Sequence, residues 1–499
     1  MNIRRCLRTL PTTAAVVVVL CLSCDRAKSQ TAAEKPGFRA GAATANITPY
    51  LGEPIVGNFT TPPATHVHDE LHARCIVLDD GANRLAIILC DSVGVSREVF
   101  DAAKKRAAEK SGIPATNILA AATHSHSATS SKSRNILRAN ETLAPYQELL
   151  SRRIADAIQV ASNNLQPARI GWGAVDVPGP LHNRRWLLKP GATNLNPFGG
   201  RDRAVMNPGN RPDLLEPAGP TDPQVSFIAV QTPEGRPIAL LANYSLHYVG
   251  GVPNGHLSAD YFACFARRIG ALLGADPNAF PPFVGILSNG TSGDVNNIEV
   301  KATTRRSYQP YEKMNIVADE IAEAVAGAYK SIAFHDHVPL AAAYRELKLA
   351  VRKPTPEQLD RARAILAKPE DAPKEHPLER AYAQRTLSLH DAPDEISAPI
   401  QVLRIGDLGV AAIPFEVFSE AGLEIKKRSP FQPTFTIELA NGSYGYLPTP
   451  RHFALGGYET WLGTNNVEPD ASPKIVETLM ELFADLDGRR KSQTAASAK

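Results

Sequence analysis

Two histidines stand one residue apart, at His124 and His126, directly after the apolar run 118–122. If a buried strand ends there, both imidazoles emerge on the same side of it, because side chains alternate faces along a strand. Imidazole nitrogens ligate metal ions and carry protons, so one ring could hold a metal while the other reaches a substrate or a water. A His-x-His pair alone is equally typical of a polar strand end. The interpretation therefore depends on partners elsewhere in the chain.

The composition is that of ordinary globular material. Of the 499 residues, 43% are hydrophobic and 21% are charged, which suffices for one large core or two smaller ones. Lys and Arg number 54 and Asp and Glu 51, so the formal net charge is +3. No basic stripe interleaved with aromatics stands out, which argues against nucleic acid as a partner. Nothing in the sequence predicts an obligate protein partner.

Residues 1–24 have the pattern of a signal peptide, with a basic start followed by the apolar run 14–22. That run is too short to span a bilayer but suits a signal-peptide core. We expect export to the periplasm or the extracellular space, with 25–37 as a flexible linker. Two processing outcomes stay open: lipidation at Cys24, which would attach the protein to a membrane, or ordinary cleavage within 29–33.

Export would leave three cysteines, Cys75, Cys90 and Cys264. They are too few and too widely spaced for a disulfide scaffold. Cys75 and Cys90 lie in apolar runs that could be neighbouring strands. A bridge between them is one interpretation, and two buried thiols is the one we favour.

From about residue 38 the chain alternates short apolar runs with helical patterns, which indicates an α/β architecture. Strands are predicted at 74–79, 84–90, 117–122, 225–231, 237–243, 283–288, 340–350 and 399–413. Capping residues and apolar periodicity predict helices at 97–110, 311–330 and 473–486.

Three segments differ from this pattern. Charged residues and proline dominate 353–395, which predicts a surface helical insertion with solvated faces. Segment 186–222 is rich in Pro, Gly and Asn and reads as a long loop, of the kind that forms lids or binding walls. The tail 489–499 is predicted to be disordered. No internal repeat is visible.

Polar residues follow several predicted strands, at the edge where α/β sheets commonly place their chemistry. These groups are Tyr244-Ser245-Leu246-His247, the turn-forming run 289–297, Phe415-Glu416, the run 440–449, and Tyr458-Glu459.

With these groups in view, the chain resembles the catalytic domain of the neutral, non-lysosomal ceramidases from about residue 40 to about residue 487. The shared signposts, in the family's order, are Ala122-Thr123-His124-Ser125-His126-Ser127, Asn183-Arg184, His247, Ser258-Ala259-Asp260-Tyr261, Gly293-Asp294-Val295, Glu416, Tyr446 and Tyr458. The resemblance implies one catalytic domain at 38–488, an α/β fold of mixed sheets with flanking helices.

The resemblance also implies a zinc site. The ligands would be His124, His247, Glu416 and Tyr446. The residues facing the substrate would be His126, Arg184 and Tyr458. Nitrogen and oxygen ligands of this kind suit zinc and leave room for a water.

Two departures from the family pattern matter. The family's Gly-Asp-Val-Ser turn, whose serine has been proposed as a nucleophile, here reads Gly293-Asp294-Val295-Asn296. In addition, the sequence ends soon after the helix predicted at 473–486, so we expect no counterpart of the family's C-terminal immunoglobulin-like domain.

The sizes of two catalytic effects indicate whether the reaction needs the missing serine. Zinc lowers the pKa of a bound water from about 15.7 to about 7, whereas a positioned general base adds only about 10²- to 10⁴-fold. We therefore favour attack by zinc-bound hydroxide over an acyl-enzyme, with Asn296 as a polar wall or an amide donor. His126 or Asp294 would relay the proton, and Tyr458 with Arg184 would stabilise the oxyanion.

Each of these residues also has a purely structural interpretation. His247 could be a core histidine, Glu416 could cap the helix that follows it, and Arg184 could be surface charge. Tyr446 and Tyr458 could be packing aromatics with hydrated hydroxyls.

Other histidines offer a rival site. His66, His68, Asp69 and His72 are close in sequence, but they precede the strand 74–79 instead of following one. We interpret them as a feature of the pocket rim, with direct metal ligation as the alternative. His335-Asp336-His337 has the pattern of an exposed connector.

Three classes of function stay open: a zinc amidohydrolase acting on ceramide or a related lipid or small-molecule amide, a hydrolase of the same fold acting on another amide or ester, and a non-catalytic surface-anchored binding protein. The intact ligand set argues against the third. The missing serine and the polar loop weigh towards the second over a true ceramidase. Residues that would make the channel wet, if this loop folds over the pocket, are Asn194, Asn196, Arg201, Asp202 and Arg203.

Overall fold

The computed structural model describes residues 37–57, 60–129, 131, 136–137, 142–304 and 306–497, with side chains described as far as Gly488. The predicted signal peptide, the linker up to residue 36 and the two processing outcomes at Cys24 and 29–33 lie outside the described residues. Within these ranges, no helix combines the length and the apolar character that crossing a membrane requires.

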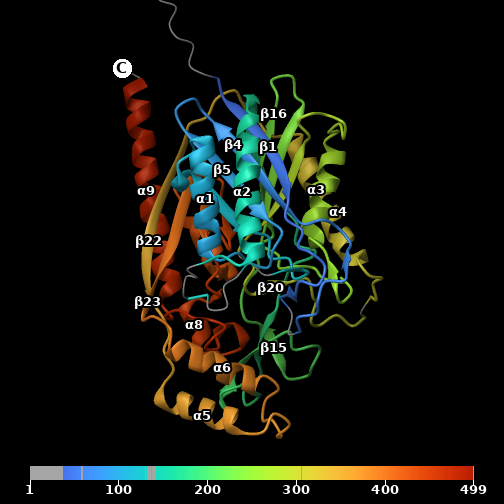
Figure 1. The fold of residues 1–499 in the computed structure, drawn as a ribbon, viewed down its shortest axis with the longest axis vertical. Helices are drawn as coiled ribbons and strands as arrows, with labels where there is room; N and C mark the ends of the chain where they lie inside the picture. The colour runs from blue at the N-terminus through green and yellow to red at the C-terminus, as the bar shows by residue number, and fades with distance from the viewer. Residues whose placement is uncertain are drawn as a thin grey trace, which may run out of the picture. The chain divides into compact units, whose positions relative to one another are not determined.

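The first sheet has the strand order β6-β5-β4-β1-β8. Its strands are β1 (Arg39–Asn46), β4 (His72–Asp79), β5 (Arg84–Cys90), β6 (Ile118–Ala122) and β8 (Gln166–Pro167). Strand β4 pairs antiparallel to both β1 and β5, whereas β6 pairs parallel to β5. Helix α1 (Arg97–Ser111) joins β5 to β6, and α2 (Pro145–Asn163) packs beside it over the same sheet (Figure 1).

The second sheet repeats this arrangement, with the order β19-β17-β16-β9-β21. Its strands are β9 (Arg169–Asp176), β16 (Gln224–Gln231), β17 (Pro237–Tyr244), β19 (Val284–Asn289) and β21 (Phe334–His335). Strand β19 pairs parallel to β17 after the helix α3 (Asp260–Leu272), and α4 (Glu312–Tyr329) packs against α3.

The third sheet has the order β22-β23-β24-β26 and the same connections. Its strands are β22 (Leu340–Ala350), β23 (Glu395–Ile405), β24 (Leu408–Ile413) and β26 (Thr434–Glu438). Strand β26 pairs parallel to β24 after α7 (Ser419–Arg428), and α9 (Ala471–Ser497) contacts α7, β22 and β23. The chain thus runs three times through three antiparallel strands, a helix, a parallel strand and a second helix. The repeat is one of topology and was not visible in the sequence.

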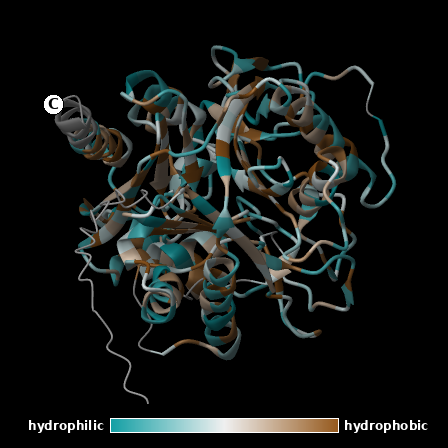
Figure 2. Ribbon diagram, turned by 90° about the horizontal axis from the view of Figure 1, so that it is seen from above, coloured by the Kyte–Doolittle hydropathy of each residue, from teal (hydrophilic) through white to brown (hydrophobic). Residues whose placement is uncertain are grey.

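The three parallel edge strands β6, β19 and β26 contact one another in the interior, and Ala121 forms an isolated bridge with Ala440 between the first and third sheets. Leu119, Ile286 and Ile437 belong to one core cluster that joins the sheets. Seen from above, the strands lie inside and helices lie around them (Figure 2). Because each parallel pair ends near this junction, the loops that follow the pairs are brought together.

Local sequence explains helix α1, which was predicted to within one residue. It follows Ser96 in extended conformation and ends at Gly112, whose φ of 72° places it in the left-handed region. Glycine has no Cβ penalty there, and its N–H donates to the carbonyl of Ala108. Val99 and Phe100 are fully buried in the core cluster beneath the helix.

The α/β fold class is confirmed, and seven of the predicted strands lie close to observed ones. The run 399–413 is instead a hairpin, because Gly406 with a φ of 62° turns the chain between β23 and β24. Cys75 and Cys90 are buried free thiols, and burial raises the pKa of both.

Two of the three unusual segments are more ordered than predicted. Segment 186–222 was predicted as a loop but forms short strands, because its residues pair locally in small sheets: β11 (Arg185–Leu188), β12 (Asn194–Leu195), β13 (Arg201–Asp202), β14 (Ala204–Met206) and β15 (Leu214–Pro217). The insertion 353–395 holds the helices α5 (Pro356–Ala367) and α6 (Glu379–His390). Helix α9 continues to Ser497, into the tail predicted to be disordered.

Several short elements complete the region around the candidate site. They are β10 (His182–Asn183), β20 (Val295–Asn296), β25 (Glu416–Val417), β27 (Tyr446–Leu447), α8 (Pro450–Phe453) and the 3₁₀ turn η2 (Tyr458–Thr460).

Candidate metal centre

Two predicted zinc ligands, His124 and His247, meet although 123 residues separate them. Their Nε2 atoms lie 3.0 Å apart, and both side chains are about 2% exposed or less. His247 and Glu416 each stand three residues beyond the end of a third antiparallel strand, β17 and β24 respectively. The topological repeat therefore accounts for their convergence, because it gives the two residues equivalent places in neighbouring sheets.

The protonation pattern of the two rings follows from their outer hydrogen bonds. His124 Nδ1 lies 2.7 Å from the carbonyl oxygen of Val93, and His247 Nδ1 lies 3.1 Å from that of Ser292. A carbonyl oxygen only accepts, so each Nδ1 carries a hydrogen, and a ring in its neutral form then presents a lone pair at Nε2. Burial, followed by the nearby His124 and Arg184, holds the pKa of His247 well below its usual range. The two Nε2 atoms thus face each other in a buried place with their outer nitrogens already engaged.

Glu416 adds a third acceptor to this group. Its Oε2 lies 3.3 Å from His124 Nε2 and 3.9 Å from His247 Nε2. Acceptors that face one another in a dry interior repel unless a cation lies among them. Neutral imidazoles and a carboxylate are the donors that zinc takes in proteins, and their Nδ1 hydrogen bonds are the usual support of such ligands. The donor set therefore fits a zinc ion.

Tyr446 reaches the same place from the parallel pairing of β25 with β27, in which it stands opposite Glu416. Its hydroxyl hydrogen bonds with the side chain of Glu416 and accepts a 2.9 Å hydrogen bond from Arg184 Nη2. Burial raises the pKa of Tyr446 well above its usual value, against the opposing effect of Arg184. All four predicted ligands are thus brought together.

His126 also belongs to the group. Its Nε2 lies 3.0 Å from His124 Nε2, and His124, His126 and His247 form the one cluster of potential metal ligands found among the described residues. Its ring stacks on Tyr248 at 3.8 Å between centroids. Gly57 also lies close to the ring, because a Cβ there would come within 2.7 Å of the imidazole. The ring is therefore clamped in place.

The route by which the two histidines of the His-x-His pair converge differs from the predicted one. Strand β6 ends at Ala122, and His124 has a left-handed φ of 71°, a conformation that costs a non-glycine residue free energy. The rings meet because the backbone turns at His124, and not because of strand alternation.

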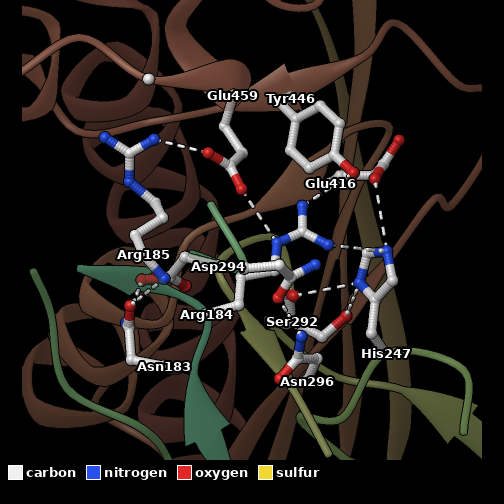
Figure 3. A network of polar contacts seen from close by, with 12 residues as sticks. Asn183, Arg184, Arg185, His247, Ser292, Asp294, Asn296, Glu416, Tyr446 and Glu459 are labelled. Carbon is white, nitrogen blue, oxygen red and sulfur yellow. Dashed lines mark hydrogen bonds and ion pairs between the residues drawn. The ribbon is translucent and has the colours of Figure 1, made fainter. Parts of the chain in front are cut away.

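Arg184 is buried at the centre of this network (Figure 3). Its Nη1 lies 3.3 Å from His247 Nε2, and its Nε donates to Glu459 at 2.9 Å. The other oxygen of Glu459 accepts a hydrogen bond from Arg185 at 2.5 Å. Burial opposes the charge of Arg184, but Tyr446 and Glu459 raise its pKa, so it remains a cation. The structural alternative of surface charge is excluded for Arg184.

The turn that carries Asp294 and Asn296 is close by, but its side chains are engaged elsewhere. Asp294 accepts hydrogen bonds from the backbone and hydroxyl of Ser419 and from Asn183 Nδ2, at 2.9, 3.0 and 2.7 Å. Asn296 donates to Asn207 Oδ1 at 2.6 Å, and its carbonyl accepts from the backbone of Ile298 at 3.0 Å. Their geometry supports the loop and the start of α7, and it points neither group at the imidazoles.

Tyr458 lies at the edge of the centre, where its ring packs 5.8 Å from that of Tyr446. Together with Glu416 they line a cavity of about 600 Å³. The predicted wall residues of 194–203 are not among the described residues lining it. Helix α6 of the insertion lines it instead, because Tyr382 anchors that helix against Trp461. The insertion predicted as a solvated surface thus forms part of the cavity wall.

One supporting residue was missed by sequence reasoning. Glu438, fully buried at the end of β26, accepts hydrogen bonds from Ser292 Oγ and from the backbone of Val417, both at 2.7 Å. Ser292 in turn holds His247 through its carbonyl, and Val417 adjoins Glu416. A polar residue ending a buried strand was the available signal. Glu438 links the supports of two ligands on different sheets.

The rival histidine cluster does not form a metal group. His66 stacks on His256, and His68 stacks on Tyr311. Asp69 accepts hydrogen bonds from Ser258 Oγ and the backbone of Ala259, at 2.6 and 2.8 Å. These ring stacks and hydrogen bonds have a structural role. His335 is exposed, as predicted, and stacks on Trp172.

Comparison with known proteins identifies the architecture. No protein-family model matches the sequence. Among solved structures, neutral ceramidase from Pseudomonas aeruginosa matches with a TM-score of 0.66 and 16% sequence identity, over 91% of this chain and 75% of that one. A structure described as ceramidase complexed with C2 matches with a TM-score of 0.67 and 17% identity, over 91% and 76% of the two chains. The chain therefore has the fold of the neutral ceramidases.

Proposed function

We propose that this protein is a zinc-dependent amidohydrolase that cleaves the N-acyl bond of a lipid-like amide. The shared fold supports the reaction class. The observation that carries the proposal is the convergence of His124 Nε2, His247 Nε2 and Glu416 Oε2 within 3.9 Å, with both ring tautomers set to present lone pairs. We assign His124, His247, Glu416 and Tyr446 as the residues that would hold the metal.

In hydrolysis the amide C–N bond breaks, the oxygen of water bonds to the acyl carbon, and a proton passes to the amine that leaves. A zinc ion at this centre would supply Lewis-acid polarisation and lower the pKa of a water. We assign the proton transfers to His126, because it is only partly buried and its Nε2 lies beside the ligand group. The ring's clamping by Tyr248 and Gly57 favours a fixed path for the proton.

The remaining roles concern charge on the acyl oxygen. Arg184 is a buried cation held by Glu459, and Tyr458 lines the cavity beside Tyr446. A preorganised donor of this kind contributes about 2.7–4 kcal/mol to the stabilisation of an oxyanion. We assign both side chains to that task. The engaged carboxylate of Asp294 has a supporting role, and Asn296 belongs to the wall of the loop.

The test combines metal analysis with turnover. Purified protein should contain close to one zinc per chain and release fatty acid from N-acyl amides. His124→Ala and His247→Ala should each lose the zinc and lower kcat/KM by more than about 10³-fold, since the metal supplies most of the catalysis. His335→Ala, an exposed histidine outside the centre, is the matched control. Retained zinc together with retained turnover in either ligand variant would refute the assignment.

Export, with or without lipidation at Cys24, is part of the proposal and rests on the sequence alone. Mass determination of the mature N-terminus would decide between the two processing outcomes.

A further inference from the structure

The cavity beside the metal centre has an uneven distribution of charge. Among the described residues that line it, Glu416 is the one acidic residue and Arg385 the one basic residue. Glu416 directs an oxygen at the two ligand imidazoles, so its charge belongs to the metal centre. Arg385 is left as the charge that faces the rest of the cavity.

Arg385 has an aromatic partner and no carboxylate partner among the described side chains. Its Cζ lies 4.7 Å from the centroid of the Tyr382 ring, one turn earlier on α6. A guanidinium stacked on an aromatic ring keeps its N–H edge available for hydrogen bonds. As far as the described side chains go, this edge has no ion pair to break before it binds an anion.

The packing of the backbone around Arg385 fixes the position of its guanidinium group. Gly463 has a φ of 89°, and a Cβ there would lie 2.8 Å from the Cβ of Arg385. Only glycine lets α6 approach the 463 backbone this closely. Tyr382 hydrogen bonds with Thr464, and its ring packs 5.2 Å from that of Trp461. The helix that presents Arg385 is thus docked on the segment that also carries Tyr458.

The charge acts on the centre itself. Burial and then Glu416 raise the pKa of Tyr458, whereas Arg385 lowers it. Arg385 and Tyr458 both line the cavity, so one substrate bound there can contact both.

The other side chains on the α6 wall indicate which part of the substrate lies there. Gln384 and Ser388 flank Arg385 on the cavity side, and Asn466 and Thr464 line it from the adjoining segment. The apolar residues Ile136, Leu137, Ala381 and Leu389 line the cavity as well. Amides and hydroxyls suit a polar head group better than a hydrocarbon chain, which gains free energy from apolar contacts.

We propose that Arg385 binds a carboxylate on the amine portion of the substrate, so that the preferred substrates are N-acyl amino acids. The proposal rests on the proposed amidohydrolase function. A guanidinium matches a carboxylate with two parallel hydrogen bonds. Cleavage would break the amide bond and yield a fatty acid and a free amino acid, which fits the polar lining of the cavity.

The test compares two amides with the same acyl chain. The full-length, zinc-loaded protein is assayed with N-dodecanoyl-glycine and with neutral N-dodecanoyl-ethanolamine. We expect kcat/KM to favour the glycine amide by at least about tenfold, and Arg385→Met to lower it about 10- to 100-fold for that amide alone, because the substitution removes the hydrogen bonds to the charged carboxylate. The change in the ethanolamine amide should stay within about threefold.

Arg363→Met on α5 is the matched control, since this arginine is 59% exposed and does not line the cavity. It should leave both substrates unchanged. Arg385→Glu should reverse the preference, favouring the neutral amide. Equal loss on both amides in Arg385→Met, or a wild-type preference for the ethanolamine amide, would overturn the carboxylate assignment while leaving the hydrolase function intact.

A binding measurement separates this inference from the proposed function. Calorimetric titration with N-dodecanoyl-glycine should give a Kd that rises about 10- to 100-fold in Arg385→Met, whether or not turnover occurs. Binding that depends on Arg385 without hydrolysis of either amide would support the carboxylate site and refute the amidohydrolase. Hydrolysis with binding that is insensitive to Arg385 would do the reverse.

Discussion

Two parts of the candidate site, both anticipated from the sequence, differ in where their hydrogen bonds go. The imidazoles of His124 and His247 use their outer nitrogens on backbone carbonyls and turn their inner nitrogens toward each other and toward Glu416. The side chains of Asp294 and Asn296, in contrast, bond to the loops and the helix around them. Acceptor atoms from distant segments that converge on one point indicate chemistry, whereas polar atoms engaged by the loops and helix around them indicate support.

Tyr446 and His126 compete to be the fourth metal ligand. Substituting each in turn gives the strongest test of which polar groups react and which support. Tyr446 hydrogen bonds with Glu416, and His126 Nε2 lies 3.0 Å from His124 Nε2. If Tyr446 is the ligand and His126 the proton carrier, Tyr446→Phe should release zinc to a chelator, whereas His126→Ala should keep its zinc and lose about 10²- to 10⁴-fold in kcat/KM. Zinc content after dialysis against graded chelator, together with kcat/KM, gives both readouts.

The reverse pattern, with zinc lost from His126→Ala and kept in Tyr446→Phe, would transfer the ligand role to His126. That outcome would leave the metal centre standing with three imidazoles and a carboxylate, and it would remove the assigned proton path. His335→Ala controls for the loss of a histidine at an exposed position.

Glu459 is the residue at which the role of the supporting contacts can be tested. This fully buried carboxylate neutralises Arg184 and Arg185, whose side chains are 5% and 0% exposed. Glu459→Gln leaves buried cations unpaired, and we expect the free energy of unfolding to fall by about 3–5 kcal/mol. The urea midpoint under reversible conditions measures it.

The surface pair of Arg345 and Glu481 supplies the matched control, because its side chains are 39% and 63% exposed. Glu481→Gln should change the free energy of unfolding by less than about 1 kcal/mol. Equal effects of the two substitutions would mean that the buried Arg184–Glu459–Arg185 group does not hold the centre together.

Much of the fold was accessible from sequence patterns, because buried strands leave apolar runs and capped helices leave end signals. Strand β4 and helix α1 are examples. Strand β1 was missed because its sequence is rich in alanine, threonine and glycine. Helix α3 was missed although its apolar residues gather on one face, because no capping side chain marks its start. The threefold repeat was invisible because it conserves strand order and not residues.

The residues of the candidate site could be predicted by a different route. The identities of the proposed ligands came from a family resemblance, while the support for them came only from three-dimensional structure. Glu459 contacts Arg184 across 275 positions of sequence, and no local pattern encodes such a contact. Helix α6 was expected to be a solvated surface because its charged faces dominate its composition. Its Tyr382 is buried against the segment beside the centre, and that one contact changes the role of the insertion.

The smallest expected effect concerns Asn296, which stands where the related turn has a serine. Because its amide bonds to Asn207 and to the backbone of Ile298, we assign it to support, and Asn296→Ser should change kcat/KM for N-acyl amides by less than about tenfold, or about 1.4 kcal/mol. Asn296→Ala is the matched control, because it removes the same hydrogen bonds without adding a hydroxyl. A gain of 10²-fold or more confined to the serine variant would show that a nucleophile had been restored, and it would move this turn from the supporting part of the site to the reacting part.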